Sequence, residues 1–237
     1  MHPAPRPESL RIAGPQGALE ALVEEPSRGV AASGGGSAFG VVCHPHPLHG
    51  GTLANKVVTT LARALHELGV PTLRFNFRGV GASEGRFAGG TGEAQDALAA
   101  VEWGKARWPG AEPFLLGFSF GAIVALGTAR AAGARLLVTV APPVARAAGA
   151  PPIERSPGIE QMARESAVPR APWLIVQGDA DEIVDAARVL AWAATHDPQP
   201  TVRVLAGAGH FFHGRLVELR ETIVAFVREA RLGGGGL

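Results

Sequence analysis

The chain of 237 residues is long enough to bury a sizeable hydrophobic core, in one large domain or two small ones. Its 22 Lys and Arg residues nearly balance its 21 Asp and Glu residues, so charge gives no reason to expect a nucleic acid or an anionic membrane as partner. Cys43 is the only cysteine, which excludes an internal disulfide and a thiolate zinc cluster.

The N-terminal stretch "MHPAPRPESL" lacks the basic-then-apolar pattern of a secretory signal. Along the whole sequence, no apolar run approaches the roughly 18 residues that a membrane span requires. The sequence therefore predicts a soluble, cytoplasmic protein with no membrane partner.

The first half of the chain alternates between short apolar runs and longer amphipathic ones. Apolar and charged residues alternate over 18–25, which predicts a half-exposed strand. Leucines recur on one helical face over 54–69, and the run ends at a glycine, as helices often do. A second amphipathic helix, over 91–108, has Thr91 as its candidate N-cap. Further strands are predicted over 39–43, 70–77 and 113–118.

The same alternation continues to the end of the chain. Strands that alternate with helices imply an α/β fold, with a mostly parallel central sheet and helices on both faces. Short linkers favour a single domain over 1–237, with 233–237 as a disordered tail. Only residues 142–170 lie between the predicted strands 134–141 and 171–178, so any cap that this segment forms over the site is small. The predicted helices are 120–132, 185–196 and 215–231, and the predicted strands are 134–141, 171–178 and 201–207.

The most informative stretch is "LLGFSFGAIVAL", which places Gly-x-Ser-x-Gly at 117–121, directly after an apolar strand and directly before a helix. The two glycines allow a tight strand-to-helix turn that holds the Ser119 hydroxyl away from the sheet. The start of the helix adds backbone donors and a positive dipole end near the reacting oxygen. In this context Ser119 is the predicted nucleophile, against the alternative of an ordinary Gly-Ser turn.

A serine hydroxyl is a poor nucleophile at neutral pH, so it needs a base, and the base needs an orienting acid. His210 directly follows a predicted strand, on a glycine-containing loop that can fold back towards Ser119. It is the predicted base, with His213 as the alternative.

Four acidic residues follow the predicted 171–178 strand, in "QGDADEIVD", so the acid that orients His210 is one of four neighbours. Asp179 comes so soon after the strand that it can brace the turn, and Asp185 can cap the next helix. Asp181 is preferred over both and over Glu182. The chain order Ser, acid, His is then the one that α/β hydrolases require.

These motifs resemble those of the α/β-hydrolase superfamily over roughly residues 38–215. The resemblance is greatest to the small, nearly capless hydrolases related to dienelactone hydrolase, here with a serine nucleophile. It rests on "HPHPLHGGTLANKVV", "LRFNFRGVGASEG" and "QGDADEIV", with "GFSFG" and "GAGHFF" as features of the whole superfamily. The resemblance implies an α/β-hydrolase fold with a minimal cap, and it places the acid at Asp181.

A tetrahedral intermediate needs two preorganised N–H donors. The amide of Phe120, the residue after the nucleophile, is one predicted donor. The second comes from the loop after the 39–43 strand, where Pro45 and Pro47 have no N–H. By resemblance to the His-Gly-x loop of the superfamily, His46 is the predicted second donor, and Leu48 is a further candidate.

His44, His46 and His49 have the spacing of a metallohydrolase ligand run, but Leu48 stands where that pattern has an aspartate. We therefore expect no metal and no cofactor. "GVGASEG" imitates a dinucleotide fingerprint with its third glycine one residue late, so no nicotinamide site is expected. Residues that flank the reacting groups are candidates for an apolar substrate pocket, with core packing as the alternative: Phe118, Phe211, Phe212 and His49.

Together these features predict a serine hydrolase that cleaves small carboxylic esters through an acyl-enzyme intermediate. A thioesterase or a peptidase would use the same three residues. A catalytically silent hydrolase fold that acts as a binding protein is the alternative from another class.

Overall fold

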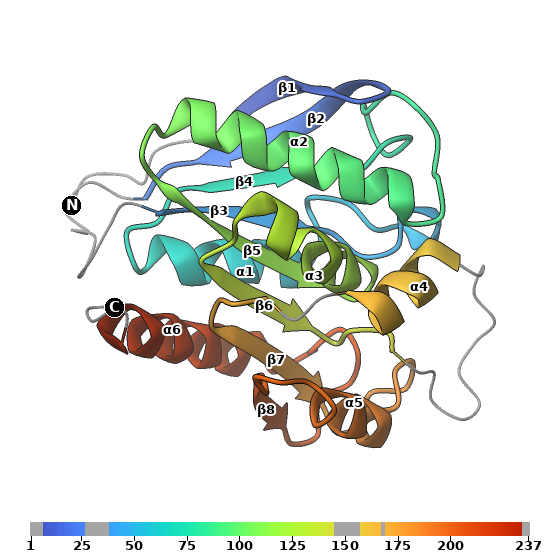
Figure 1. Ribbon diagram of the computed structural model, residues 1–237, viewed down its shortest axis with the longest axis vertical. Helices are drawn as coiled ribbons and strands as arrows, with labels where there is room; N and C mark the ends of the chain where they lie inside the picture. Colours follow the sequence, from blue (N-terminus) through green and yellow to red (C-terminus); the bar gives the residue numbers. More distant parts are fainter. Residues whose placement is uncertain (1–6, 27–37, 145–156, 167–168, 234–237) are drawn as a thin grey trace.

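The computed structural model describes residues 7–26, 38–144, 157–166 and 169–233 (Figure 1). Within these residues, eight strands form one sheet in the order β1-β2-β4-β3-β5-β6-β7-β8. The six strands from β4 to β8 in this order run parallel, whereas β2 pairs antiparallel with both β1 and β4. The strands are β1 Glu8–Gly14, β2 Gly17–Glu24, β3 Ala38–Cys43, β4 Thr72–Phe75, β5 Glu112–Phe118, β6 Leu136–Val140, β7 Trp173–Gly178 and β8 Thr201–Leu205.

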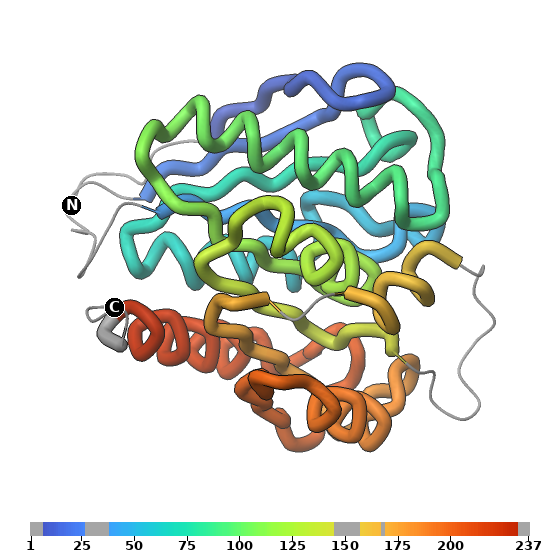
Figure 2. Tube along the Cα trace, viewed as in Figure 1, coloured from blue at the N-terminus to red at the C-terminus, as the bar shows by residue number. Residues whose placement is uncertain are grey.

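Helices cover both faces of this sheet, which confirms the predicted α/β architecture (Figure 1). α1 and α6 pack on one face, and α2 and α3 pack together on the other, where α4 contacts α3. The path of the chain leads from the β1–β2 hairpin at one edge to β8 at the other (Figure 2). The helices are α1 Lys56–His66, α2 Thr91–Arg107, α3 Phe120–Ala132, α4 Pro157–Glu165, α5 Ala186–Ala193 and α6 Leu216–Gly233, with a short 3₁₀ turn, η1, over Pro47–His49.

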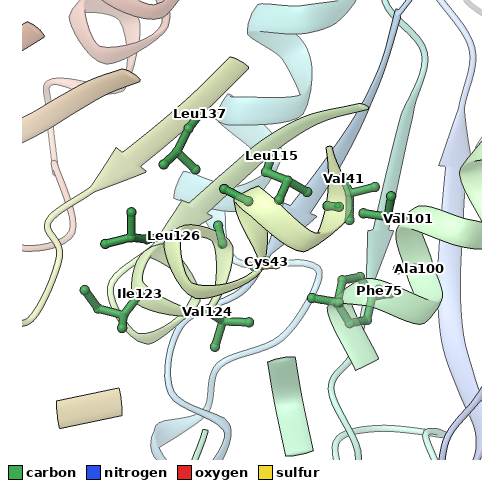
Figure 3. Close-up of a cluster of buried hydrophobic side chains, with 14 of the residues drawn as sticks. Val41, Cys43, Phe75, Ala100, Val101, Leu115, Ile123, Val124, Leu126 and Leu137 are labelled. Carbon is green, nitrogen blue, oxygen red and sulfur yellow. The ribbon is translucent and has the colours of Figure 1, made fainter. Parts of the chain in front are cut away.

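The central strands are buried on both faces, and their side chains divide between two cores. Along β5, Leu115 packs on the α2–α3 side and Leu116 on the α1–α6 side. Successive side chains of a strand point to opposite faces, so an apolar run such as this one is what a doubly covered sheet requires. Figure 3 shows the α2–α3 core, where Val41 and Leu115 of the sheet meet Ile123 and Val124 of α3.

The structure adds two elements that the sequence pattern does not predict. β1 is an edge strand with Ile12 as its one fully buried residue, so it lacks a strong apolar alternation. α4 has only nine residues and buries Ile159 alone, so its apolar pattern is short. The predicted N-cap at Thr91 is wrong. α2 begins after Gly90, whose N–H donates to the Glu93 carboxylate at 2.7 Å, and Thr91 is already the first helical residue.

A buried ion pair fixes the long loop between β4 and α2. Arg78 Nε and Nη2 donate to the two oxygens of Asp96 at 2.9 and 2.7 Å, and the Arg78 N–H donates to the same carboxylate at 3.0 Å. Both side chains are at most 2% exposed. The hydrogen bonds that Arg78 donates to Asp96 are the main reason that the pKa of Arg78 is raised, although burial opposes them. This pair anchors the start of the loop to α2.

No helix within the described ranges is both long and apolar enough to cross a membrane.

Replacing Asp96 with Ala should leave the Arg78 guanidinium buried without its hydrogen-bonded counter-charge. We expect the free energy of unfolding to fall by about 3–5 kcal/mol, measured by urea denaturation. Glu102→Ala removes an exposed ion pair with Lys105 on the same helix and should cost less than about 1 kcal/mol. Equal effects of the two substitutions would contradict an anchoring role for the buried pair.

Candidate active site

Ser119 occupies the turn between β5 and α3, in a strained backbone conformation with φ 53° and ψ −121°. A positive φ is rare for a residue with a side chain and persists only where the surroundings enforce it. Here the Ser119 N–H donates to the Val140 carbonyl of β6 at 2.8 Å. A Cβ at Gly117 would overlap with the Gly121 carbonyl, so the turn is too tight for any larger residue at 117. The local geometry is that of a nucleophile elbow.

The loops after β7 and β8 bring an acid and a histidine to this turn. His210 Nε2 lies 3.1 Å from Ser119 Oγ, and His210 Nδ1 lies 2.9 Å from Asp181 Oδ2. His210 and Asp181 are 3% and 8% exposed, so these contacts are largely shielded from water. The three predicted residues therefore form one continuous hydrogen-bonded chain.

The neighbouring acidic residues hold the two loops together and do not reach the imidazole. Asp179 Oδ1 accepts from the Gly207 N–H at 2.6 Å, and Glu182 Oε2 accepts from the His210 N–H at 3.0 Å. Asp185 caps α5 by accepting from the Arg188 N–H at 3.1 Å. The helix-capping alternative proposed for Asp185 is thus confirmed, whereas Asp179 links the loop after β7 to the loop after β8 and does not bond its own turn. Asp181 is the carboxylate that contacts His210.

The alternative base, His213, is exposed, and its ring packs loosely against Phe211 with centroids 6.0 Å apart. It therefore lies outside the chain of hydrogen bonds that starts at Ser119.

Asp181 accepts hydrogen bonds on both of its oxygens. Burial alone would raise the pKa of Asp181, but the hydrogen bond and charge of His210 and the N–H groups of Val184 and Ile183 outweigh it. The net effect is a pKa below the ordinary value, so the carboxylate is ionised at neutral pH. An ionised acid at this position stabilises a cationic imidazole.

His44 is a structural link between two loops and not a metal ligand. Its Nδ1 donates to the Pro45 carbonyl at 2.6 Å, and its Nε2 accepts from the Phe77 N–H at 3.0 Å. Both nitrogens are therefore engaged by the backbone, and the side chain is fully buried. Burial lowers the pKa of His44 to about 4, against the opposing effect of the Pro45 carbonyl, so the ring is neutral.

The loop that contains His44 lies against the first turn of α3. A Cβ at Gly121 would overlap with the carbonyl oxygens of Cys43 and His44, so only glycine permits this approach of the two backbones. The contact holds the loop after β3 next to the residue that follows the nucleophile. The Phe120 amide belongs to the first helical turn, where N–H groups have no acceptor within the helix.

His46 lies at the edge of this contact. Its ring packs edge-on against Phe120, with centroids 5.0 Å apart, and its Nδ1 accepts from the Leu48 N–H at 3.2 Å. The amide N–H of Leu48, the alternative oxyanion donor, is therefore already hydrogen-bonded within the loop. Burial, followed by the nearby His49, lowers the pKa of His46 to about 4.

The predicted pocket residues divide into two groups. Phe118 and Phe212 are fully buried in the α1–α6 core, so as pocket-lining residues both are wrong. Phe118 instead supports the His210 ring at 5.1 Å, and Phe212 turns inward at a backbone φ of 53°. Phe211 is 38% exposed beside His210, with centroids 5.1 Å apart.

On the opposite side of the elbow, His49 is exposed and packs against His46, with centroids 4.5 Å apart. Phe87, which the sequence did not single out, packs against His46 and Phe120 at 5.1 and 5.9 Å. It reaches the site from the loop between β4 and α2, and no local motif marks it.

Proteins of known structure share this fold. XC6422 from Xanthomonas campestris, whose crystal structure is described as a member of a/b serine hydrolase without lid, is 39% identical. The match covers 96% of this chain and 97% of that chain, with a TM-score of 0.83. This chain belongs to the α/β serine hydrolase family.

An alpha-beta serine hydrolase homologue from Coxiella burnetii is 44% identical to this α/β serine hydrolase, with a TM-score of 0.79 over 92% of this chain and 96% of that chain. The uncharacterized protein RP471 of Rickettsia prowazekii is 33% identical over 89% of this chain and 84% of its own length. A family model described as Serine aminopeptidase, S33, matches residues 46–158. The resemblance to the α/β-hydrolase superfamily is thereby confirmed.

The lowered pKa of His44 predicts a loss of stability in acid. The unfolded chain binds a proton at this residue as pH falls through about 6.5, whereas the folded chain does so only near 4, so the folded state is disfavoured in between. At pH 5 this linkage should cost about 2 kcal/mol. His44→Gln should reduce by that amount the difference in unfolding free energy between pH 7.5 and pH 5, measured in urea. The control Val217→Gln changes an exposed residue with no titratable group and should leave the difference unchanged.

The close approach at Gly121 can be tested with a single methyl group. Gly121→Ala should displace α3 from the loop after β3 and slow the labelling of Ser119 by a fluorophosphonate about 100-fold, because displacements of about 1 Å disrupt aligned reacting groups. Gly127→Ala, in the same helix, meets only the flexible end of the Met162 side chain and is the matched control. Unchanged labelling of a folded Gly121→Ala variant would show that the contact is not needed.

Proposed function

We propose that this α/β serine hydrolase cleaves small carboxylic esters through an acyl-enzyme intermediate. The observation that carries the proposal is the hydrogen-bonded chain from Ser119 Oγ through His210 to Asp181. A hydroxyl within 3.1 Å of an imidazole nitrogen can transfer its proton as it attacks a carbonyl carbon.

In the first half of the reaction, Ser119 Oγ bonds to the ester carbonyl carbon while His210 Nε2 takes the hydroxyl proton. The Asp181 carboxylate accepts from Nδ1–H, which holds the imidazole in the tautomer with a free Nε2 and stabilises its cationic form. His210 then donates the proton to the departing alkoxide, which leaves as an alcohol. In the second half, a water attacks the acyl group with His210 as base, and Ser119 is regenerated. No step requires a cofactor.

The negative oxygen of each tetrahedral intermediate is stabilised, in this proposal, by the amides of Phe120 and His46. Support comes from the contact between Gly121 and the carbonyls of Cys43 and His44, which holds the two amide-bearing segments together. A single donor of this kind is typically worth about two to three orders of magnitude in rate.

Two exposed rings near the reacting residues support small esters as substrates. Phe211 packs against His210 and His49 packs against His46, and both are exposed, so each can contact an acyl or alcohol group. Hydrolysis of a free peptide N-terminus would instead need a carboxylate to hold the ammonium group. The nearby carboxylates of Asp179 and Glu182 already accept backbone N–H groups.

The proposal predicts turnover of a short acyl aryl ester such as p-nitrophenyl acetate. Ser119→Ala and His210→Ala should lower kcat/KM by at least about three orders of magnitude, and Asp181→Asn by a similar factor, because the three residues act as a unit. Labelling by a fluorophosphonate should be lost in Ser119→Ala and much reduced in His210→Ala. His213→Ala, three residues from the base, is the matched control and should keep wild-type activity.

Different results would identify the rival functions. A folded wild-type protein that neither hydrolyses any short ester nor reacts with the fluorophosphonate would favour a binding protein. Activity that is lost with a chelator, in the absence of labelling, would indicate metal chemistry. A panel of esters and thioesters with varied acyl and alcohol parts would then define the preferred leaving group.

A further inference from the structure

Gln177 is a polar residue at a position where the sheet otherwise buries apolar side chains. It is fully buried near the end of β7, and the preceding residues Leu174, Ile175 and Val176 are buried and apolar. An amide in such a place costs free energy unless its polar atoms are hydrogen-bonded. A buried glutamine in a central strand therefore needs a physical reason.

The hydrogen bonds of Gln177 are made at one end of its amide only. Its Nε2 donates to Asp181 Oδ2 at 3.0 Å and to the Gly178 carbonyl at 3.2 Å. Its Oε1 is buried, and among the described residues no donor reaches it. The Gln177 oxygen is thus buried and unpaired among the described residues, which is unfavourable, whereas the NH₂ group of the same side chain contacts Asp181.

Asp181 accepts four hydrogen bonds, two on each oxygen. Oδ1 accepts from the N–H groups of Ile183 and Val184 at 2.9 and 2.8 Å, which belong to its own loop. Oδ2 accepts from His210 Nδ1 and from Gln177 Nε2. An ionised carboxylate has about four acceptor sites, so the set is complete. Gln177 is the donor at Oδ2 that belongs to the rigid sheet, whereas His210 comes from a loop.

We propose that Gln177 is a positioning residue for the hydrolase reaction. It holds Asp181 Oδ2 in the direction of His210 Nδ1 and stabilises the ionised carboxylate with a neutral donor, so it adds no charge that would compete with the cationic imidazole. This inference rests on the proposed function, since it assigns a role within the same hydrogen-bonded chain.

The first test is Gln177→Met, which keeps roughly the same volume and removes both the donor and the unpaired oxygen. We expect kcat for p-nitrophenyl acetate to fall about tenfold, the typical effect of one hydrogen bond to a charged group, with KM unchanged. Because the unpaired buried oxygen is also removed, Tm should stay the same or rise. A folded Gln177→Met variant with wild-type kcat would overturn the proposal.

The second test is Gln177→Glu, which is nearly isosteric and makes the donor depend on pH. A protonated carboxyl group at 177 can donate to Asp181 Oδ2, whereas an ionised one places a like charge next to it. The ratio of kcat/KM between this variant and the wild type should therefore fall as pH rises, while the corresponding ratio for Gln177→Met should stay constant. A ratio for Gln177→Glu that does not change with pH would contradict the proposal, whatever the stability of either variant.

Thr139→Val is the matched control for a buried polar residue on the neighbouring strand. The Thr139 hydroxyl accepts from Trp173 Nε1 at 2.9 Å and belongs to no contact with Asp181 or His210. This variant should lose stability and keep its kcat, the reverse of the result expected for Gln177→Met. Fluorophosphonate labelling of Ser119 in the wild-type protein separates the proposed function from the proposed role of Gln177. If the wild type is not labelled, the proposed function fails. If it is labelled while the variants at 177 behave as wild type, only the role of Gln177 fails.

Discussion

Parallel pairing of six strands brings the reacting groups of this protein to one edge of the sheet. Because each crossover returns the chain to the same end of the sheet, the loops after β3, β5, β7 and β8 all leave at the carboxyl edge. Ser119, Asp181 and His210 follow three different strands and are far apart in sequence, yet His210 lies within 3.1 Å of both Ser119 and Asp181. An antiparallel arrangement would place alternate loops at opposite edges and separate them.

Close contacts between backbones help to fix the loops at this edge. Gly117 and Gly121 allow the elbow to close on itself and on the loop after β3. At Gly178 a Cβ would overlap with the Ala208 carbonyl, so the acid loop and the histidine loop also touch through their main chains. Such contacts leave little freedom for the loops to shift, which is what alignment of a nucleophile and a base requires.

Buried polar groups form a second layer behind the site, and each is neutral or paired. His44 links the loop after β3 to the start of the loop after β4 as an uncharged ring. Arg78 and Asp96 neutralise one another where that second loop meets α2. Gln177 contacts Asp181 without adding charge. Asp181 is the carboxylate in contact with the His210 ring, whereas the neighbouring Glu182 carboxylate accepts from the His210 backbone N–H.

The sequence by itself determined the alternation of strands and helices, the elbow at Ser119 and the order of acid and base, because periodicity and Gly-x-Ser-x-Gly are local signals. It could not assign the roles of His44, Gln177 or Phe87, since each depends on a contact that only the folded chain forms: His44 with the Phe77 amide, Gln177 with Asp181, and Phe87 with His46 and Phe120. It left Phe118 and Phe212 open between a pocket and the core, and the tertiary structure buries both in the core. Only packing decided that the Phe118 and Phe212 rings lie in the core, and which of four neighbouring carboxylates contacts the His210 imidazole. Burial and hydrogen-bond geometry are properties of the assembled sheet edge and not of any one segment.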